Sequence, residues 1–348
     1  FSGEPKHAVC YPLVTRIIPV RNTSTDLVLF KPRLLKFKRT RGGSRLTCRM
    51  ATVFLNGQFV ERDAATVSAF DAGFQHAVGL FETMLGVRSG GGTHTIMALQ
   101  EHTERLAASA AALDLSRDMS AEALGEACME TFRRSELPRA RIRLTVTGGD
   151  LNLLETQGKT THRPTILITS QPATDYPAEM FEKGVLATVA DAKANPLDPT
   201  ASHKTLNYWW RLRELQRAAA KGAGEAIVFQ VSNHAAGGCV SNLLAVHGDR
   251  VLTPICRGEE PEGSLPSPVL PGVTRARVLG WAEEAGLEVS RQMLTIDDLL
   301  GASEVMLTNS SWGVLPVTQL ESRQIGEGRP GEVSRSLVER WRKETDFG

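Results

Sequence analysis

Hydrophobic and polar residues alternate or recur at regular spacing along most of the chain, and the spacing predicts both strands and helices. Two apolar triplets, 53–55 and 58–60, flank Asn56 and Gly57. Asn-Gly readily adopts the positive φ angles of a type I′ turn, so this segment is predicted to be a β-hairpin. Residues 139–147 alternate with period two, which is typical of a half-buried strand.

Helical spacing dominates other segments. Apolar residues recur every three or four positions over 99–115, and Ser120 is placed to cap a second helix that reaches about Arg134. Strands and helices are mixed rather than strictly alternating, so the pattern favours two α/β or α+β domains over a doubly wound sheet. The further strands expected are 163–170, 184–191, 226–231, 240–247, 251–252 and 305–308, and the further helices are 205–221, 274–286, 296–301 and one from about 331.

Two changes in composition suggest how the chain is divided. Residues 1–49 contain 11 Lys and Arg against only Glu4 and Asp26, which is typical of a targeting segment or a nucleic-acid contact. We favour a poorly structured extension with no catalytic role and expect no nucleic-acid binding. Two prolines in 171–177 interrupt both periodicities. The domains expected are therefore a basic extension at 1–49, a small domain at 50–172, a linker at 173–180 and a larger domain at 181–348.

Composition narrows the class of protein. Of 348 residues, 41% are hydrophobic and 23% are charged, and the net charge is +1, a balance typical of a soluble globular protein. No stretch approaches 18 consecutive apolar residues, so no membrane span is expected. The five cysteines are scattered without CxxC spacing, which argues against a disulfide framework and a zinc site. We therefore expect a cytoplasmic protein without a bound metal.

Lys204 becomes notable through the motifs that surround it along the chain. A lysine beside a proline-containing loop is ordinarily a solvated surface charge. Here it lies in a series of motifs that, in this order and over about 53–331, resembles the fold-type-IV pyridoxal-phosphate enzymes. This family contains branched-chain aminotransferases, D-amino-acid aminotransferases and aminodeoxychorismate lyases. The motifs are DAGFQHAVGLFET at 71–83, HTERL at 102–106, SHKTLNYWW at 202–210, LPGVTR at 270–275 and TNSSWG at 308–313.

The resemblance implies a two-domain α/β fold and a pyridoxal 5′-phosphate cofactor held as a Schiff base on Lys204. Arg105 matches the family arginine that holds the cofactor phosphate, and a planar guanidinium suits this task because it pairs two oxygens at once. A helix that starts near Val273 would add free backbone N–H groups to an anion site. The residues implied to bind the cofactor are Lys204, Arg105, Tyr208, Val273, Thr274 and Ser310.

The same resemblance supplies substrate residues, each with an ordinary alternative. Phe81 and Tyr208 match positions that face the substrate and the cofactor's phenolic oxygen, and each is equally consistent with a core aromatic. Tyr208 follows Lys204 by four residues, which on a helix would place both on one face. Arg143 matches a carboxylate-binding arginine, although a strand arginine is also consistent with a solvated side chain. The substrate-binding residues implied are Phe81, Arg143, Ser311 and Trp312.

Gly237 departs from the family pattern. It stands where relatives have a glutamate that keeps the pyridine nitrogen of the cofactor protonated and so strengthens the cofactor as an electron sink. The loss of one charge-assisted hydrogen bond, roughly 1.5–3 kcal/mol, corresponds to one or two orders of magnitude in rate.

The resemblance therefore leaves three functions open. The first is a branched-chain-like aminotransferase acting between an amino acid and a 2-keto acid. The second is pyruvate release of the aminodeoxychorismate lyase type. The third is a cofactor-binding relative whose activity is weak or lost because of Gly237. The resemblance also implies a homodimer.

Overall fold

The predicted hairpin begins the part of the chain that the structure describes. The computed structural model describes residues 52–150 and 163–345, and the extension expected at 1–49 lies outside these residues. Strands β1 (Thr52–Leu55) and β2 (Gln58–Glu61) pair antiparallel. Asn56 and Gly57 between them have φ angles of 49° and 89°, as the expected turn requires. The hairpin prediction is confirmed.

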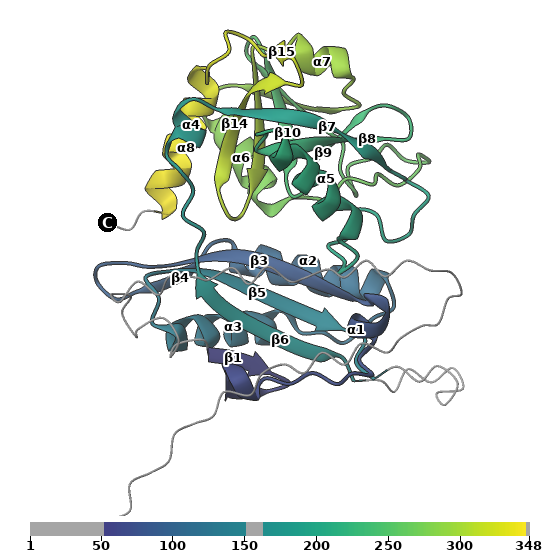
Figure 1. The fold of residues 1–348 in the computed structure, drawn as a ribbon, viewed down its shortest axis with the longest axis vertical. Coiled ribbons are helices and arrows are strands. Elements are labelled where there is room, and N and C mark those ends of the chain that lie inside the picture. Colours follow the sequence, from purple (N-terminus) through teal and green to yellow (C-terminus); the bar gives the residue numbers. More distant parts are fainter. Residues whose placement is uncertain (1–51, 151–162, 346–348) are drawn as a thin grey trace, which may run out of the picture. The chain divides into compact units, whose positions relative to one another are not determined.

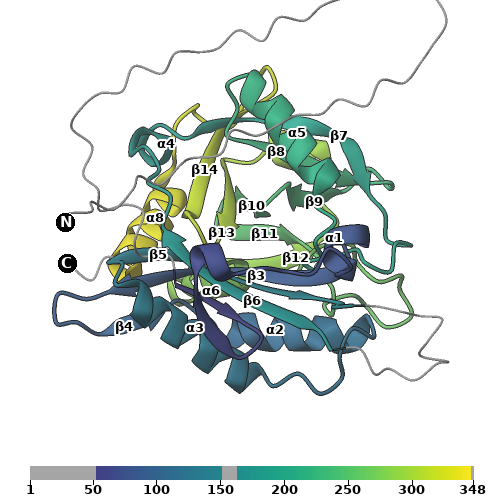
Figure 2. The same cartoon turned by 60° about the horizontal axis from the view of Figure 1, so that its bottom comes forward.

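In the described residues, six strands form one sheet in the order β2-β1-β6-β5-β3-β4. Helices α2 and α3 cover one of its faces (Figures 1 and 2). The side chain of Ser120 accepts a hydrogen bond from Ala123 N, so it caps α3 as predicted. The elements of this part, besides the hairpin, are η1 (Arg62–Ala64), α1 (Ala72–His76), β3 (Gly79–Arg88), β4 (His94–Ile96), α2 (Leu99–Ala112), α3 (Ala121–Ser135), β5 (Arg139–Thr147) and β6 (Thr165–Pro172).

The alternation of β5 separates two environments. Ile142 and Leu144 are fully buried in an apolar cluster with residues of α2 and α3. Successive side chains of a strand point to opposite faces, so Arg141 and Arg143 lie on the face that α2 and α3 leave uncovered. The strand was predicted with these bounds, and its uncovered face carries much of the site described below.

A second sheet of nine strands follows in the described residues, in the order β12-β11-β10-β13-β14-β7-β8-β9, with β15 paired to β14 (Figure 1). Helices α6 and α8 pack on one of its faces through an apolar cluster that includes Trp281 and Trp341, and α5 packs against β7 and β8. The elements are α4 (Glu179–Glu182), β7 (Val185–Ala194), α5 (Trp209–Ala220), β8 (Glu225–Gln230), β9 (Ala235–Gly238), β10 (Asn242–His247), β11 (Arg250–Pro254), α6 (Val273–Glu284), β12 (Glu288–Gln292), α7 (Ile296–Leu300), β13 (Glu304–Asn309), β14 (Gly313–Leu320), β15 (Arg323–Gln324) and α8 (Glu332–Thr345).

The helix expected to start at Thr205 starts later, at Trp209. Lys204 O accepts from Phe81 N at 2.9 Å, and Leu206 N donates to Gly79 O at 2.9 Å. Because these backbone groups bond to the edge of β3, they are not available for helical hydrogen bonds. Lys204 therefore lies in an extended segment beside β3, and the argument that it shares a helical face with Tyr208 was wrong.

All described residues belong to one compact unit. Strand β6 ends at Pro172 and α4 starts at Glu179, so an irregular segment does separate the two sheets in sequence. The division into domains at 173–180 stays a prediction. Strands β4, β9, β12, β14 and β15 were not anticipated. No helix in 52–150 or 163–345 combines the length and apolar character that crossing a membrane requires.

Candidate active site

A cavity of about 750 Å³ is lined by the uncovered face of the six-stranded sheet and by loops of the nine-stranded sheet. This volume lies within the range typical of small-molecule sites. The loops include the segment before α5, the β9–β10 turn, the start of α6 and the turn after β13. The cavity lining includes all ten residues predicted for the site, namely Phe81, Arg105, Arg143, Lys204, Tyr208, Val273, Thr274, Ser310, Ser311 and Trp312.

Lys204 and two aromatic residues lie together in this cavity. The Lys204 Nζ donates to the Tyr208 hydroxyl at 3.3 Å and lies 4.6 Å from the ring centroid of Phe81. The rings of Phe81 and Tyr208 meet edge to face at 5.0 Å. Burial raises the pKa of Tyr208, but the positive charges of Lys204 and Arg211 outweigh it and leave that pKa below its usual value. A polar amine is thus held between two aromatic rings, and a lysine in open solvent is excluded.

Two hydroxyls meet at the start of α6. Gly272 is the N-cap residue of this 12-residue helix, and Thr274 lies in its first turn. The first backbone N–H groups of a helix have no partner within the helix and favour an anion. Thr274 Oγ1 lies 3.1 Å from Ser310 Oγ, and Ser310 Oγ lies 3.1 Å from His102 Nε2. These groups, from two distant parts of the sequence, form a candidate anion site.

Behind this anion site lies a buried charged group that was not predicted. The Glu82 carboxylate, 1% exposed, accepts from His102 Nδ1 at 2.7 Å and from Arg105 Nε and Nη2 at 2.8 and 2.7 Å. Burial alone would raise the pKa of Glu82, but Arg105 and His102 lower it to about 2. Burial lowers the pKa of His102. A neutral imidazole that donates from Nδ1 to Glu82 accepts at Nε2, so the Ser310 hydroxyl donates to it.

Arg105 is therefore already paired. Besides its two bonds to Glu82, its Nη1 donates to Pro271 O at 2.8 Å, which ties α2 to the loop before α6. The planar fork expected to grip two phosphate oxygens is engaged by a carboxylate. Arg105 also lines the cavity. Phosphate binding by Arg105 stays a prediction, and the fork geometry is not available for it.

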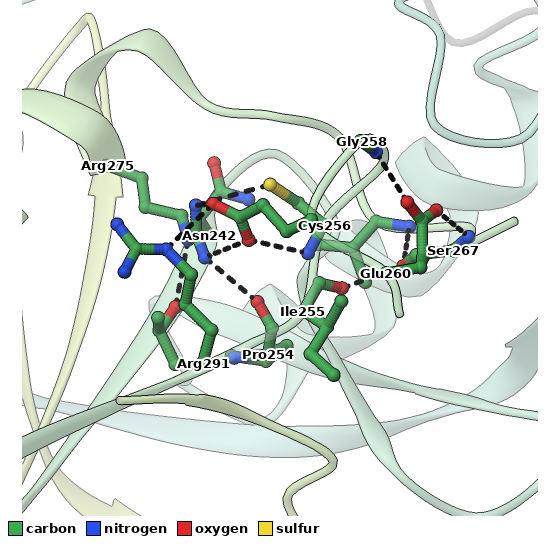
Figure 3. A network of polar contacts seen from close by, with 12 residues as sticks. Asn242, Pro254, Ile255, Cys256, Gly258, Glu260, Ser267, Arg275 and Arg291 are labelled. Atoms are coloured by element: carbon green, nitrogen blue, oxygen red, sulfur yellow. Dashed lines mark hydrogen bonds and ion pairs between the residues drawn. The ribbon is translucent and has the colours of Figure 1, made fainter. Parts of the chain in front are cut away.

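A second arginine holds the start of α6 in place. Arg275, 2% exposed, donates through Nε to Thr253 Oγ1 and through Nη2 to Pro254 O, at 2.9 and 3.1 Å. Arg275 and Arg291 both bond the Glu259 carboxylate, at 2.8 and 3.0 Å, in the network that Figure 3 shows. This network fixes the loop before α6 to β11, and with it the position of Thr274.

On the substrate side, Arg143 lies with its guanidinium carbon 3.8 Å from the ring centroid of Phe81. Burial is the main cause that lowers the pKa of Arg143. In the described residues it has no carboxylate partner. Its position on the cavity wall agrees with the predicted role and excludes the alternative of a fully solvated side chain.

The loop after β13 is shaped by Asn309. Its Oδ1 accepts from the backbone N–H groups of Ser311 and Trp312, at 2.9 and 3.1 Å. The Trp312 Nε1 and the Thr308 Oγ1 are buried and have no hydrogen-bond partner within the described residues. Because buried polar groups are nearly always paired, these two atoms on residues that line the cavity can bond a water or a ligand there.

Gly237 has a backbone that only glycine adopts easily. Its φ is +146°, and a Cβ there would lie 2.8 Å from Ser241 O. The nearby Glu225 carboxylate is fully buried and accepts from Cys239 N, Val240 N and the Ser241 hydroxyl, among others. It does not line the cavity. No carboxylate among the described residues therefore replaces the missing glutamate at the cavity wall.

An arginine occupies this part of the wall instead. Arg211 lines the cavity and donates to the carbonyl oxygen of Cys239 at 3.1 Å. Its guanidinium carbon lies 4.4 Å from the ring centroid of Trp210. The side chain of Arg211 thus brings a positive charge from α5 to the β9–β10 turn, where the resemblance implies a glutamate.

Comparison of the sequence and the fold with known proteins identifies the family. The family described as Amino-transferase class IV matches residues 79–320. The chain belongs to the class IV aminotransferase family. Enzymes of this family depend on pyridoxal phosphate, so this chain is a pyridoxal-phosphate-dependent enzyme of the aminotransferase or lyase type.

Individual relatives agree with this membership. The branched-chain-amino-acid aminotransferase of Salmonella typhimurium is 29% identical over 291 residues, which is 82% of this chain and 90% of that protein. The D-alanine aminotransferase of Bacillus licheniformis is 29% identical over 292 residues, 82% of this chain and 94% of that protein.

Solved structures of class IV aminotransferases superpose on the described fold. The branched-chain amino acid aminotransferase of Escherichia coli has a TM-score of 0.77 and 26% identity over 85% of this chain and 95% of that one. The 4-amino-4-deoxychorismate lyase of Pseudomonas aeruginosa has a TM-score of 0.70 and 26% identity over 85% of this chain and all of that one. The α/β fold expected from the motifs is confirmed.

Several site residues were missed at the level of sequence. Glu82 and His102 lie inside quoted motifs, but nothing in the spacing shows that a carboxylate and an imidazole 20 residues apart meet in the core. Arg141 was detectable, since it shares the polar face of its strand with Arg143. Arg211 gave no signal, because a polar position on a helix is ordinarily solvated.

Proposed function

We propose that this protein transfers an amino group between an amino acid and a 2-keto acid, with Lys204 as the residue that binds the cofactor aldehyde. The observation that carries the proposal is the Lys204 Nζ inside the cavity, 3.3 Å from the Tyr208 hydroxyl. The cofactor, when bound, supplies an electron sink for the bond that breaks at the substrate's Cα.

The donor set fits a phosphorylated aldehyde of this kind. The N–H groups of Val273 and Thr274 at the start of α6, with the hydroxyls of Thr274 and Ser310, would bind the phosphate. Arg105 would add its remaining N–H groups and its charge. Tyr208 would donate to the phenolic oxygen, and its position beside Lys204 supports this role.

Proton transfer is assigned to the same lysine. With the substrate amine on the cofactor, the Lys204 Nζ would take the proton from the substrate's Cα and deliver it to the cofactor's aldehyde carbon, on the other side of the amine nitrogen. Phe81 lies against Nζ and would keep water away from it. Arg143 would bind the substrate carboxylate beside this ring.

Two observations bear on which reaction of the family is catalysed. Branched-chain and D-alanine aminotransferases are both among the relatives, and Tyr208 and Arg143 match aminotransferase positions, which favours amino transfer of a branched-chain-like kind. The likeness to an aminodeoxychorismate lyase structure supports pyruvate release as a second candidate. Both reactions use Lys204. A cofactor-binding relative with weak or lost activity is the third candidate, and the observation that favours it is Gly237, with Arg211 beside it, at the place of the expected glutamate.

A homodimer is part of the proposal. Phe74 and Trp209 are each 79% exposed, and Leu212 is 48% exposed although it also lines the cavity. Exposed large apolar side chains near a site are typical of a surface that a partner covers. Light scattering after gel filtration is expected to give twice the mass of the chain. A monomer that transfers amino groups at full rate would rule this part out.

The central experiment replaces Lys204 with alanine. Protein loaded with cofactor is expected to lose its visible absorption band, and amino transfer should fall by at least about 10²–10⁴-fold, the usual effect of removing a general acid and base. Lys183→Ala is the matched control, because Lys183 is exposed and its one ion pair within residues 52–150 and 163–345 is with Glu179. A Lys204→Ala protein that kept the band and the rate would refute the assignment.

A donor and acceptor panel that includes aminodeoxychorismate separates the two reactions. Amino transfer predicts a keto acid product in equal amount to the aminated acceptor. The lyase predicts pyruvate without any acceptor.

A further inference from the structure

The cavity wall offers no negative charge to the pyridine nitrogen of the cofactor. Among the described residues that line the cavity there is no Asp or Glu. Nearby positive charges disfavour a protonated pyridine nitrogen, because both carry the same sign. Of the cationic residues that line the cavity, only Arg105 pairs with a carboxylate within the described residues, the buried Glu82. The cationic residues are Lys204, Arg105, Arg141, Arg143 and Arg211.

Much of the wall near the β9–β10 turn is apolar. A buried apolar cluster lies behind α5, β8 and β9, and several of its members line the cavity. Burial in apolar surroundings disfavours the charged form of a titratable group, so this wall also favours an uncharged ring. The cluster members that line the cavity are Val228, Ala236, Cys239 and Val269, with Leu215 and Val240 packed against the cluster.

The backbone of the β9–β10 turn keeps carboxylates away from the cavity. Gly237 has a φ of +146°, and a Cβ there would lie 2.8 Å from Ser241 O, so a side chain at this position would be strained. The carboxylate of Glu225 is fully buried, bonds Cys239 N and Val240 N, and does not line the cavity. The turn therefore presents no acceptor of negative charge to a protonated nitrogen.

Arg211 brings hydrogen-bond donors to the same turn. Its Nη1 donates to Cys239 O at 3.1 Å and to Gly238 O at 3.5 Å, and its guanidinium carbon lies 5.8 Å from the ring centroid of Tyr208. Within the described residues both of its hydrogen bonds use Nη1, so Nη2 is available to a ligand in the cavity that Arg211 lines. A guanidinium only donates, so its partner on the ring is an unprotonated nitrogen, which accepts.

The anchors of the cofactor determine which end of its ring meets this turn. Lys204 would bind the aldehyde carbon, and the ring carbons on either side of it carry the phenolic oxygen, beside Tyr208, and the phosphate arm, beside Thr274. The ring nitrogen lies at the opposite end of the ring from the aldehyde. The match of Gly237 to a family glutamate that bonds this nitrogen places the β9–β10 turn at that end.

We propose that Arg211 donates a hydrogen bond to the ring nitrogen of the bound cofactor and that this nitrogen is unprotonated in this protein. The proposal rests on the proposed function for the orientation of the cofactor, since Lys204 defines the aldehyde end. An uncharged ring is a weaker electron sink than a protonated one. A larger part of the barrier is then left to the proton removal by Lys204.

The protonation of the nitrogen can be read by nuclear magnetic resonance. Pyridoxamine phosphate, isotopically labelled at its ring nitrogen, binds without a covalent step and without turnover. Its resonance is expected at the position of an unprotonated pyridine at neutral pH. Arg211→Glu places a carboxylate on the same wall and should shift the resonance to the position of the protonated ring. Arg213→Glu is the matched control without a shift, because Arg213 lies on the same helix, is half-exposed and does not line the cavity.

A second measurement assigns the hydrogen bond to Arg211. An analogue of pyridoxamine phosphate with a C–H group in place of the ring nitrogen accepts no hydrogen bond there. Equilibrium titration should show that pyridoxamine phosphate binds roughly 10- to 100-fold more tightly than this analogue, the range of a hydrogen bond from a charged donor. Arg211→Met should bring the ratio of the two affinities close to one, and Arg213→Met should keep it. Circular dichroism checks that each variant is folded.

Three results would overturn the proposal: a resonance at the protonated position in the unaltered protein, equal affinities for the two ligands in the unaltered protein, or an affinity ratio that persists in Arg211→Met. An unshifted resonance in folded Arg211→Glu would likewise show that residue 211 does not face the nitrogen. A failure of the proposed function looks different, because it removes amino transfer with every donor while the resonance and the affinities can still be measured.

Discussion

Arg105 and Arg143 line the same cavity but differ in what balances their charge. Arg105 makes two bonds to the Glu82 carboxylate and one to Pro271 O. Arg143 contacts an aromatic ring and has no carboxylate partner among the described residues. The Arg105 guanidinium therefore stabilises the fold, whereas the charge of Arg143 is available to a ligand.

The difference shows how a protein can separate stability from binding in one pocket. A buried ion pair leaves a costly uncompensated charge if one partner is removed. When an unpaired guanidinium is removed, no buried charge in the protein is left without a partner. A carboxylate ligand, however, loses the positive charge that would bind it. Loss of Glu82 should therefore weaken folding, whereas loss of Arg143 should weaken substrate binding.

The largest effect is expected for Glu82→Gln. Arg105 and His102 would lose the carboxylate that both of them bond, so the free energy of unfolding should fall by about 3–5 kcal/mol. Urea denaturation followed by fluorescence measures this change. Glu130→Gln is the control, because Glu130 pairs with exposed arginines on α3, and a change of at most about 1 kcal/mol is expected there. Equal changes in the two variants would contradict the comparison.

The contribution of Glu82 to stability should depend on pH. The pKa of Glu82 is lowered from 4.5 to about 2 in the folded protein. Its contribution to stability is therefore complete above pH 4.5 and is lost as the pH falls from there towards about 2. The difference in unfolding free energy between the unaltered protein and Glu82→Gln should narrow over this window. A difference that stays constant would show that folding does not lower the pKa of Glu82.

An intermediate effect is expected for Arg143→Gln. The variant should lose roughly 10- to 100-fold in kcat/KM for every carboxylate substrate, because one charge-assisted bond is removed. Its unfolding free energy should change by less than about 1 kcal/mol, the value of an isolated cation–π contact. Arg143→Lys should recover part of the activity. A large loss of stability would show that Arg143, like Arg105, mainly stabilises the fold.

The smallest effect is expected for Ser310→Ala. Removing one neutral hydroxyl should weaken cofactor binding by about 3- to 10-fold, as one ordinary hydrogen bond contributes about 0.5–1.5 kcal/mol. Equilibrium titration with pyridoxamine phosphate gives the affinity without a covalent step. Ser232→Ala, at an exposed position, should bind as the unaltered protein does. Unchanged binding in Ser310→Ala would remove Ser310 from the phosphate site.

Short-range patterns were sufficient for the elements that depend on local chemistry. The hairpin at Asn56, the cap at Ser120 and the strand Arg139–Thr147 were predicted because turn geometry, capping and alternation act within a few residues. The ten residues that line one cavity were predicted for a different reason, namely the resemblance to a family. Motifs in a fixed order carry information on a whole fold that no single motif has.

Contacts between distant segments were decided only by the tertiary structure. The segment around Lys204 is extended because it bonds the edge of β3, although its own sequence is compatible with a helix. In the same way, two N–H groups of Arg105 bond the Glu82 carboxylate, although nothing in the sequence near Arg105 indicates this partner.

The sequence alone determined the periodicity of β5, the turn and cap residues and the family motifs, since these depend on the chain's own order of residues. Which charges are neutralised depends on groups that meet only after folding, as Glu82 and Arg105 do across 23 residues. The interaction energy of two charges falls with the distance between them and rises with their burial. Neither the distance nor the burial can be read from the sequence.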